Sequence, residues 1–565
     1  MTHHFPFRMQ LLKLLLVVVA LSTTLAAAPK LSSELLSLNN DTTTEVVVVY
    51  KSQPQASDFE NLEKSGIRVK SKFHKVKQAT LLLPTKKLET LESDPNVVSV
   101  VPNRRVQAHL ITARKATGAY IAEEYGLSGK GIGIVVIDSG IADLPHFQTA
   151  NCKSSRIVYS ESFVPEDSST GDPFGHGTHV AGIVAANSTC VEVESKDKDA
   201  LKKMRGIAPH AHLINLRVLD GAGIGSDVAV IAAINRAIEL KAQYNIRVIN
   251  LSLGRPIRES YTMDALCAAV EAANHAGILV VATAGNHGRN QLKGLNGYGS
   301  ISAPGNDPYA LTVGAINMKA SPEPIDDVVA SFSSKGPSAL DHVVKPDLVA
   351  PGNEIVSALA PGSFVATHYA ANVSDSYIKL SGTSMAAPMV SGAAALLLER
   401  EPSLTPAQVK TLLMRTARKI FVPSSIYTDA GGQSYVTMHD LPTIGAGEID
   451  ILSALNATAG TTEGGLSPVM VQPSAGASVF LSNSPSAGSD SSMNWETAGP
   501  SLYGAINVNG ARLEGGPGTA WGDTTIEGNS VVWGDSVIWG DSVVWGDSVV
   551  WGDSVVWGES VVWGE

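Results

Sequence analysis

The chain has 565 residues, a formal net charge of −11 and a charged fraction of only 17%. The length suggests several folding units, and the acidic balance argues against a nucleic-acid-binding protein, which normally carries a basic excess. Three cysteines exclude a disulfide-dense scaffold and most cysteine-based metal sites.

Residues 1–28 have the pattern of a secretory signal peptide. Arg8 and Lys13 precede an apolar run at 14–20, and small residues follow up to Ala28. This run is too short to cross a bilayer, which takes about 20 apolar residues, and no later stretch is apolar enough to do so. We therefore predict cleavage near Ala28 and a secreted, extracellular mature chain without a stable membrane span.

An exported chain is able to form disulfide bonds. Cys152 and Cys190 lie at the two ends of one stretch of the sequence, so a bond between them is an interpretation that stays open. Cys267 lies in an apolar helical pattern and is predicted to be a buried small apolar residue without a disulfide partner.

Residues 45–107 predict a small two-layer α+β unit. The pattern alternates strands and helices, with strands expected at 45–50, 79–83 and 97–101 and helices at 58–65 and 86–93. This unit is rich in lysine and arginine although the whole chain is acidic. A basic small unit before an acidic large one indicates an intramolecular partner.

Residues 117–457 predict a doubly wound α/β domain. Apolar runs without alternation predict parallel strands buried on both faces, at 132–137, 213–219, 248–253, 278–281 and 311–313. Helical stretches such as 227–240 and 263–276 separate these runs. The expected fold class is therefore α/β, with a mostly parallel sheet and helices on both faces. Ligands of such folds bind beyond the carboxyl ends of the strands, so functional residues should gather there.

The last part of the chain has a different composition. Residues 458–502 are rich in Gly, Ser, Pro and Thr and predict a linker. Residues 503–565 carry a glycine at every sixth position, and the late repeat is Val-Val-Trp-Gly-Asp-Ser. Two interpretations of this tail stay open: a module that binds a surface or self-associates, and a low-complexity segment with little fixed structure.

Three short motifs carry residue types used in hydrolysis. Asp138 follows an apolar strand, His176 lies in the Gly-His-Gly-Thr-His-Val-Ala-Gly motif of 175–182, and Ser384 lies in the Ser-Gly-Thr-Ser-Met-Ala-Ala-Pro motif of 381–388. Each motif alone has an ordinary interpretation as a turn, a helix start or a helix cap. Together, in the order Asp, His, Ser, they supply the three parts of a hydrolytic triad.

Further motifs extend the match along the domain, at 248–254, 282–286, 330–337 and 345–352. With these motifs, residues 117–457 resemble the subtilisin-like serine proteases, or subtilases. Residues 45–107 resemble the propeptide of the same family, through weaker motifs. The resemblance implies a subtilisin-like fold and a secreted, autoprocessed serine endopeptidase.

The resemblance also implies a role for each residue of the triad. A serine hydroxyl is a poor nucleophile at neutral pH, so His176 would take the proton of Ser384 as the hydroxyl attacks a carbonyl. Asp138 would orient His176 and stabilise its imidazolium. The backbone N–H of Ser384 and the side chain of Asn286 would form the oxyanion hole. His179 receives no catalytic role and is interpreted as structural.

The same resemblance implies a substrate pocket walled by small residues, namely Ser252, Leu253, Gly254, Thr283, Ala284 and Gly285. Small side chains in the pocket walls imply broad specificity, with a preference for large apolar or neutral residues before the scissile bond. The expected partners are protein and peptide substrates, which would add a strand along Leu253-Gly254, and the chain's own propeptide as an intramolecular inhibitor. The propeptide would be cut between about Val106 and Gly118.

The expected chemistry requires no cofactor. Bacterial subtilisins have a calcium loop soon after the histidine helix, whereas residues 187–200 of this chain form a longer and highly charged stretch. Structural calcium is therefore an open question, and no metal ligands are assigned. Two other functions stay open: a non-enzymatic surface or adhesion protein, associated with the cell surface through the tail, and an esterase.

Overall fold

The computed structural model describes residues 30–32, 35, 42–75, 77–102, 105–108, 122, 124–191, 205–290, 297–319, 326–374, 376–419, 421–429, 433–458 and 465–471, and short strands between 479 and 557. The predicted signal peptide lies outside these residues, as do positions 109–121 and most of the predicted linker and tail.

The small N-terminal unit is a four-stranded antiparallel sheet in the order β2-β3-β1-β4. Its elements are β1 (Thr43–Tyr50), α3 (Ala56–Lys64), β2 (Arg68–Phe73), β3 (Gln78–Pro84), η1 (Thr85–Lys87), α4 (Leu88–Glu92) and β4 (Val97–Pro102). The three predicted strands and both predicted helices are present. The sequence analysis missed β2, because this strand alternates exposed Arg68, Lys70 and Lys72 with half-buried residues and contains no apolar run.

The central sheet has the strand order β15-β14-β12-β10-β6-β8-β7, with β16 paired to β14. Its strands are β6 (Gly133–Asp138), β7 (Ile157–Ser162), β8 (His212–Arg217), β10 (Ile246–Leu251), β12 (Leu279–Thr283), β14 (Leu311–Asn317), β15 (Val328–Val329) and β16 (Leu348–Pro351). Only the pairing of β15 with β14 is antiparallel among these strands. The predicted α/β class with a mostly parallel sheet is therefore confirmed.

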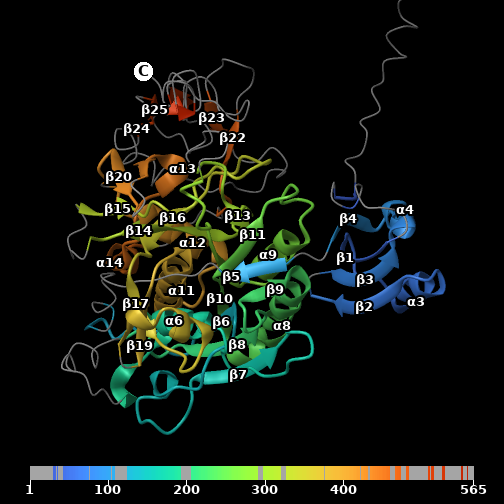
Figure 1. Ribbon diagram of the computed structural model, residues 1–565, viewed down its shortest axis with the longest axis horizontal. Helices are drawn as coiled ribbons and strands as arrows, with labels where there is room; N and C mark the ends of the chain where they lie inside the picture. The colour runs from blue at the N-terminus through green and yellow to red at the C-terminus, as the bar shows by residue number, and fades with distance from the viewer. Residues whose placement is uncertain are drawn as a thin grey trace, which may run out of the picture.

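Helices cover both faces of this sheet (Figure 1). One face packs against α6 (His176–Ala185) and α11 (Thr383–Arg400), and the other packs against α8 (Asp227–Tyr244) and α9 (Ala265–His275). The strand β6 shows why its sequence lacks alternation. Ile134 and Val136 belong to the first apolar cluster, whereas Val135 and Ile137 belong to the second. Both faces of the strand are buried, so every position is apolar.

The small unit packs on the outer side of α8 and α9 (Figure 1). Its residues Val47, Val49, Phe73 and Val101 join the apolar cluster of these two helices. Hydrogen bonds also cross this interface: Gln78 donates to the carbonyl of Ala265 (2.7 Å), and the amide of Lys75 donates to the Asn235 side chain (2.9 Å).

The strand that follows the small unit lies in the large domain. β5 (Arg105–Ala108) lies between β9 (Ile224–Ser226) and β11 (Leu253–Pro256), antiparallel to both, and β13 (Ser302–Ala303) pairs with the other edge of β11 (Figure 1). The predicted run 248–253 is in fact two strands in two sheets, because the chain leaves the central sheet after Leu251 and β11 begins at Leu253.

The remaining elements surround the sheet: η2 (Pro145–Phe147), η3 (Ser188–Cys190), β17 (Ile355–Ala358), α10 (Phe364–His368), η6 (Ala370–Asn372), β18 (Val373–Ser374), β19 (Tyr377–Leu380), α12 (Pro406–Thr416), β20 (Ser424–Thr428), β21 (Ser434–Met438), α13 (Leu441–Ile444) and α14 (Ile451–Asn456). The predicted linker and tail contribute β22 (Val469–Val471), β23 (Val479–Ser482), β24 (Asn507–Val508), β25 (Ala511–Glu514), β26 (Thr525–Glu527), β27 (Val549–Val550) and β28 (Val556–Trp557).

Cys152 and Cys190 form a disulfide bond, which resolves the alternative left open by the sequence. Cys267 is buried without a disulfide partner, as predicted. Within the described part of the chain, every helix is too short or too polar to cross a membrane.

Candidate active site

Asp138 and His176 meet at the carboxyl edge of the central sheet. Asp138 is the last residue of β6, His176 is the first residue of α6, and both are buried. The Nδ1 atom of His176 lies 2.7 Å from Oδ1 of Asp138. Because the carboxylate holds Nδ1, Nε2 is the ring nitrogen suited to exchange a proton with a substrate or nucleophile.

A second carboxylate, which the sequence analysis missed, holds the start of α6. Asp172 accepts hydrogen bonds from the amides of Gly175 (2.6 Å) and Thr178 (2.7 Å) and from the Ser139 hydroxyl (2.8 Å). The Ser139 hydroxyl in turn accepts from the amide of Gly177 (2.9 Å). Burial raises the pKa of Asp172, while these hydrogen bonds oppose the rise. An acid four residues before His176, at a helix start, is the signal that could have identified it.

Replacing Asp172 by Asn should lower kcat about tenfold or more and change KM little. Hydrogen bonds to a charged group contribute about 1.5–3 kcal/mol each, and an amide nitrogen facing the α6 amides would displace the helix that begins with His176. Steady-state hydrolysis of a chromogenic peptide measures both constants. Asp167→Asn is the matched control, since Asp167 is half-exposed and pairs with Arg217 (2.8 Å). An equal loss in both variants, or a loss confined to KM, would contradict the assignment.

Ser384 lies at the start of α11, as its second residue, and is fully buried. Its hydroxyl donates to the carbonyl of Ser252 (3.2 Å), and the Ser252 hydroxyl donates back to the carbonyl of Ser384 (3.0 Å). The positive end of a helix stabilises negative charge nearby. Ser384 therefore lies where a developing oxyanion would be favoured.

Asn286 follows β12 and is held beside Ser384 through Thr383. The Asn286 Oδ1 atom accepts hydrogen bonds from the Thr383 amide (3.0 Å) and from the Thr383 hydroxyl (3.1 Å). Because Oδ1 is used in this way, the amide nitrogen of Asn286 is the end that is able to donate to a substrate oxygen. Sequence reasoning missed Thr383, although it directly precedes Ser384.

Asn286→Ala should lower kcat by about 10²–10³-fold, the known cost of losing one oxyanion-hole donor. The substrate carbonyl gains its charge only in the transition state, so KM should change little. Steady-state assays over a range of concentrations of one peptide substrate give kcat and KM separately. Asn274→Ala, on α9, is the control and should leave both constants unchanged. A raised KM with an unchanged kcat would show that Asn286 binds substrate and does not stabilise the oxyanion.

Hydrogen bonds join four of the six predicted pocket residues to one another or to the segment Thr383-Ser384. Ser252 bonds with Ser384 as described, Thr283 donates to the carbonyl of Leu253 (3.4 Å), and the amide of Gly285 donates to Thr383 (3.3 Å). Gly285 has a φ of 111°, and a Cβ there would lie 2.5 Å from the Ser302 hydroxyl, so this wall position requires glycine. The predicted substrate edge at Gly254 is paired with β5, with Gln107 as the register partner of Gly254.

Arg255 is another residue that sequence reasoning missed. Its buried guanidinium contacts Asp227 (2.9 Å), the first residue of α8, and Asp264 (2.8 Å), the N-cap of α9. β9 leads directly into α8, so these ion pairs connect β11 to the start of the helix that follows β9. Arg255 therefore sets the spacing of the two strands between which β5 lies.

His179 is fully buried, and its Nε2 atom lies 3.2 Å from the carbonyl oxygen of Ile355 and 3.1 Å from that of Ile378. Burial lowers the pKa of His179 to about 3, so it is neutral and structural, as predicted. The described residues contain no group of three or more His, Cys, Asp or Glu side chains that could hold a metal ion. Residues 192–200 of the charged insertion lie outside them.

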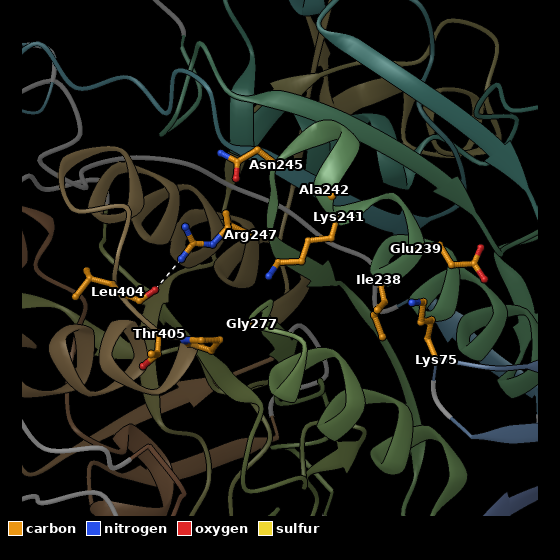
Figure 2. Close-up of a pocket in the computed structure, with 11 residues that line it drawn as sticks. Lys75, Ile238, Glu239, Lys241, Ala242, Asn245, Arg247, Gly277, Leu404 and Thr405 are labelled. Atoms are coloured by element: carbon orange, nitrogen blue, oxygen red, sulfur yellow. Dashed lines mark hydrogen bonds between the residues drawn. The ribbon is translucent and has the colours of Figure 1, made fainter. Parts of the chain in front are cut away.

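A cavity of about 610 Å³ lies elsewhere, lined by residues of the large domain and by Lys75 of the small unit. Figure 2 shows its lining, which comes from the small unit, from the C-terminal half of α8 and the strand after it, and from the start of α12, including Lys75, Lys241, Arg247 and Thr405. None of its lining residues is a predicted site residue. The cavity is therefore separate from the candidate active site.

A doubly wound sheet that carries an aspartate, a histidine and a serine in this chain order is the arrangement of the subtilisin-like serine hydrolases, which differs from the order in the α/β-hydrolase fold. A family model described as the subtilase family matches residues 129–440. The chain therefore belongs to the subtilase family and is a subtilisin-like serine endopeptidase, which confirms the resemblance seen in the sequence.

Individual relatives agree with this assignment. The chain is 35% identical over 359 residues to serine protease AprX of Bacillus subtilis, covering 61% of this chain and 75% of the relative. It is 32% identical over 377 residues to subtilisin E of the same species, covering 66% and 82%. The fold is similar to that of fervidolysin from Fervidobacterium pennivorans, with a TM-score of 0.56, 19% identity, and coverage of 80% of this chain and 69% of that one.

Proposed function

We propose that the chain is a secreted serine endopeptidase that uses Asp138, His176 and Ser384 and is made as a precursor that cuts itself. The observation that carries the proposal is the buried 2.7 Å contact between His176 and Asp138, at the edge of the sheet where α11 begins with Thr383 and Ser384. No cofactor takes part in the proposed chemistry.

In the proposed reaction, Nε2 of His176 takes the proton of Ser384 as its Oγ attacks the substrate carbonyl carbon. The oxyanion of the tetrahedral intermediate accepts hydrogen bonds from the Ser384 amide and the Asn286 side chain. His176 then donates its proton to the departing amine, which leaves an acyl-enzyme. A water molecule, deprotonated by His176, attacks the ester and releases Ser384.

The proposed specificity follows from the pocket walls. Ser252, Gly254, Ala284 and Gly285 have small or absent side chains, so they leave room for a large apolar or neutral residue before the scissile bond. The peptide backbone would add a strand along β11, a contact that reads main chain and tolerates many sequences.

Autoprocessing is supported by the position of β5. Ala108 is the register partner of Leu253, and the two strands are antiparallel. Ala108 is the last described residue of β5, and Leu253 directly follows Ser252, whose carbonyl accepts the hydrogen bond of the Ser384 hydroxyl. A substrate strand continued in this register would present its next residue to Ser252, and in this chain the next residue in sequence is His109. We therefore propose the bond between His109 and Leu110 as the one that is cut. Until β5 leaves, it fills the substrate position, so the small unit acts as an inhibitor.

Intact-mass and N-terminal analysis of the secreted protein tests this proposal. The expected mature chain begins at Leu110, and a precursor caught earlier begins near Pro29 after removal of residues 1–28. A mature N-terminus outside the range between Val106 and Gly118, or an active protein that keeps residues 45–108 in the same chain, would contradict autoprocessing at this groove.

A further inference from the structure

A short helix brings a stack of aromatic rings beside His176. The ring of Phe364, the first residue of α10, is stacked on that of Phe174 with centroids 5.6 Å apart, and the ring of His368 stacks on Phe364 at 3.8 Å. The ring of Phe174 lies 6.5 Å from that of His176. Phe174 is buried, whereas Phe364 is 39% exposed. An apolar ring surface is thus open to solvent next to the histidine.

Backbone contacts fix the position of this stack. The amide of Phe364 donates to the carbonyl of Pro173 (2.9 Å), and the amide of Val365 donates to that of Phe174 (3.0 Å). The Ser363 side chain caps α10 by accepting from the Ala366 amide (3.2 Å). The helix is therefore attached directly to the loop that leads into His176, and its exposed ring is part of a fixed surface.

The stack lies beside the path of β5. A Cβ placed on Gly223 would lie 2.5 Å from the ring of Phe174, so this ring packs against Gly223. Gly223 directly precedes β9, in which Ile224 is the register partner of Gln107. Ala108 follows Gln107 in β5, at the end of the antiparallel pair that is nearest to Gly223. The ring surface therefore borders the position two residues before the proposed scissile bond.

We propose that Phe174, Phe364 and His368 form a subsite for a large aromatic or apolar side chain, carried by the substrate at the second residue before the scissile bond. The proposal rests on the proposed function and deepens its specificity. Aromatic rings stack favourably on one another in offset geometry, beyond the gain from burying their area. The propeptide has alanine at this position, which offers no ring to the stack, as suits a segment that must leave after it is cut.

Two peptide p-nitroanilides that differ only at this residue, Phe or Ala, test the proposal on the mature enzyme. The wild-type enzyme should prefer the Phe peptide at least tenfold in kcat/KM, mainly through KM. Phe364→Ala should reduce this preference to less than threefold and leave hydrolysis of the Ala peptide within twofold. Phe364→Tyr, which keeps a ring, should retain the preference, and so should the control Tyr369→Ala, which removes an equally exposed ring at the end of α10.

A wild-type enzyme that hydrolyses the Phe and Ala peptides equally well would overturn the subsite. An equal loss of activity on both peptides, in Phe364→Ala and in Phe364→Tyr alike, would also overturn it. If the wild-type enzyme hydrolyses neither peptide and no protein, the proposed function itself is wrong, and the subsite fails with it. Activity on the Ala peptide therefore separates the two failures.

Discussion

Ser384→Ala should abolish hydrolysis of casein and leave the precursor uncut. The expected loss in kcat is on the order of 10⁶-fold, the value known for the catalytic serine of subtilisin, a member of the same family. The size of the effect follows from the chemistry, since alanine offers no oxygen to form the acyl-enzyme. The fold should be retained, because the hydroxyl makes a 3.2 Å hydrogen bond to a carbonyl and its loss leaves little space.

Casein hydrolysis and the mass of the secreted chain measure the two consequences separately. Ser381→Ala is the matched control, because Ser381 lies in the same motif and its hydroxyl accepts a hydrogen bond from the Glu354 amide (2.9 Å). This control should cut itself and hydrolyse casein normally. Activity of Ser384→Ala at a few per cent of the wild-type rate would rule out Ser384 as the nucleophile.

Asp138→Asn should lower kcat by about 10⁴-fold, the cost of the corresponding change in a chymotrypsin-like protease. The carboxylate accepts the Nδ1–H of His176 at 2.7 Å. An asparagine amide can instead donate to Nδ1, which would place the proton on Nε2 and remove the base. The imidazolium formed during the reaction would also lose its counter-charge.

The measurement is kcat for one peptide substrate, with the unfolding temperature recorded in parallel. Asp143→Asn, an exposed carboxylate five residues further on, is the control and should leave kcat unchanged. A loss of less than tenfold in a fully folded Asp138→Asn variant would mean that the His176–Asp138 contact is structural.

The local pattern of apolar residues was enough to predict the strands that are buried on both faces. In β6 both faces meet an apolar cluster, so its sequence is a continuous apolar run. The pattern failed for β2, where lysine and arginine occupy the exposed positions. It also failed at Ser252, where two apolar strands of different sheets follow one another, because hydrophobicity does not reveal a change of sheet.

The candidate site shows a similar division. Asp138, His176, Ser384 and Asn286 could be proposed from the sequence because each lies in a recognisable motif near the end of a strand or the start of a helix. Arg255 was not found, because its carboxylate partners come from the starts of two different helices and no local pattern marks such an arrangement. Phe364 of the proposed subsite was not found either, since α10 lies near His176 only through its contacts with the loop before that residue.

Labelling with a biotinylated fluorophosphonate tests the central claim most directly, since this reagent reacts with a serine that a neighbouring base activates. The mature wild-type protein should carry a single adduct, which tandem mass spectrometry places on Ser384, and His176→Ala should not be labelled. An unlabelled but folded mature protein, or an adduct on a serine other than Ser384, would contradict the proposed mechanism.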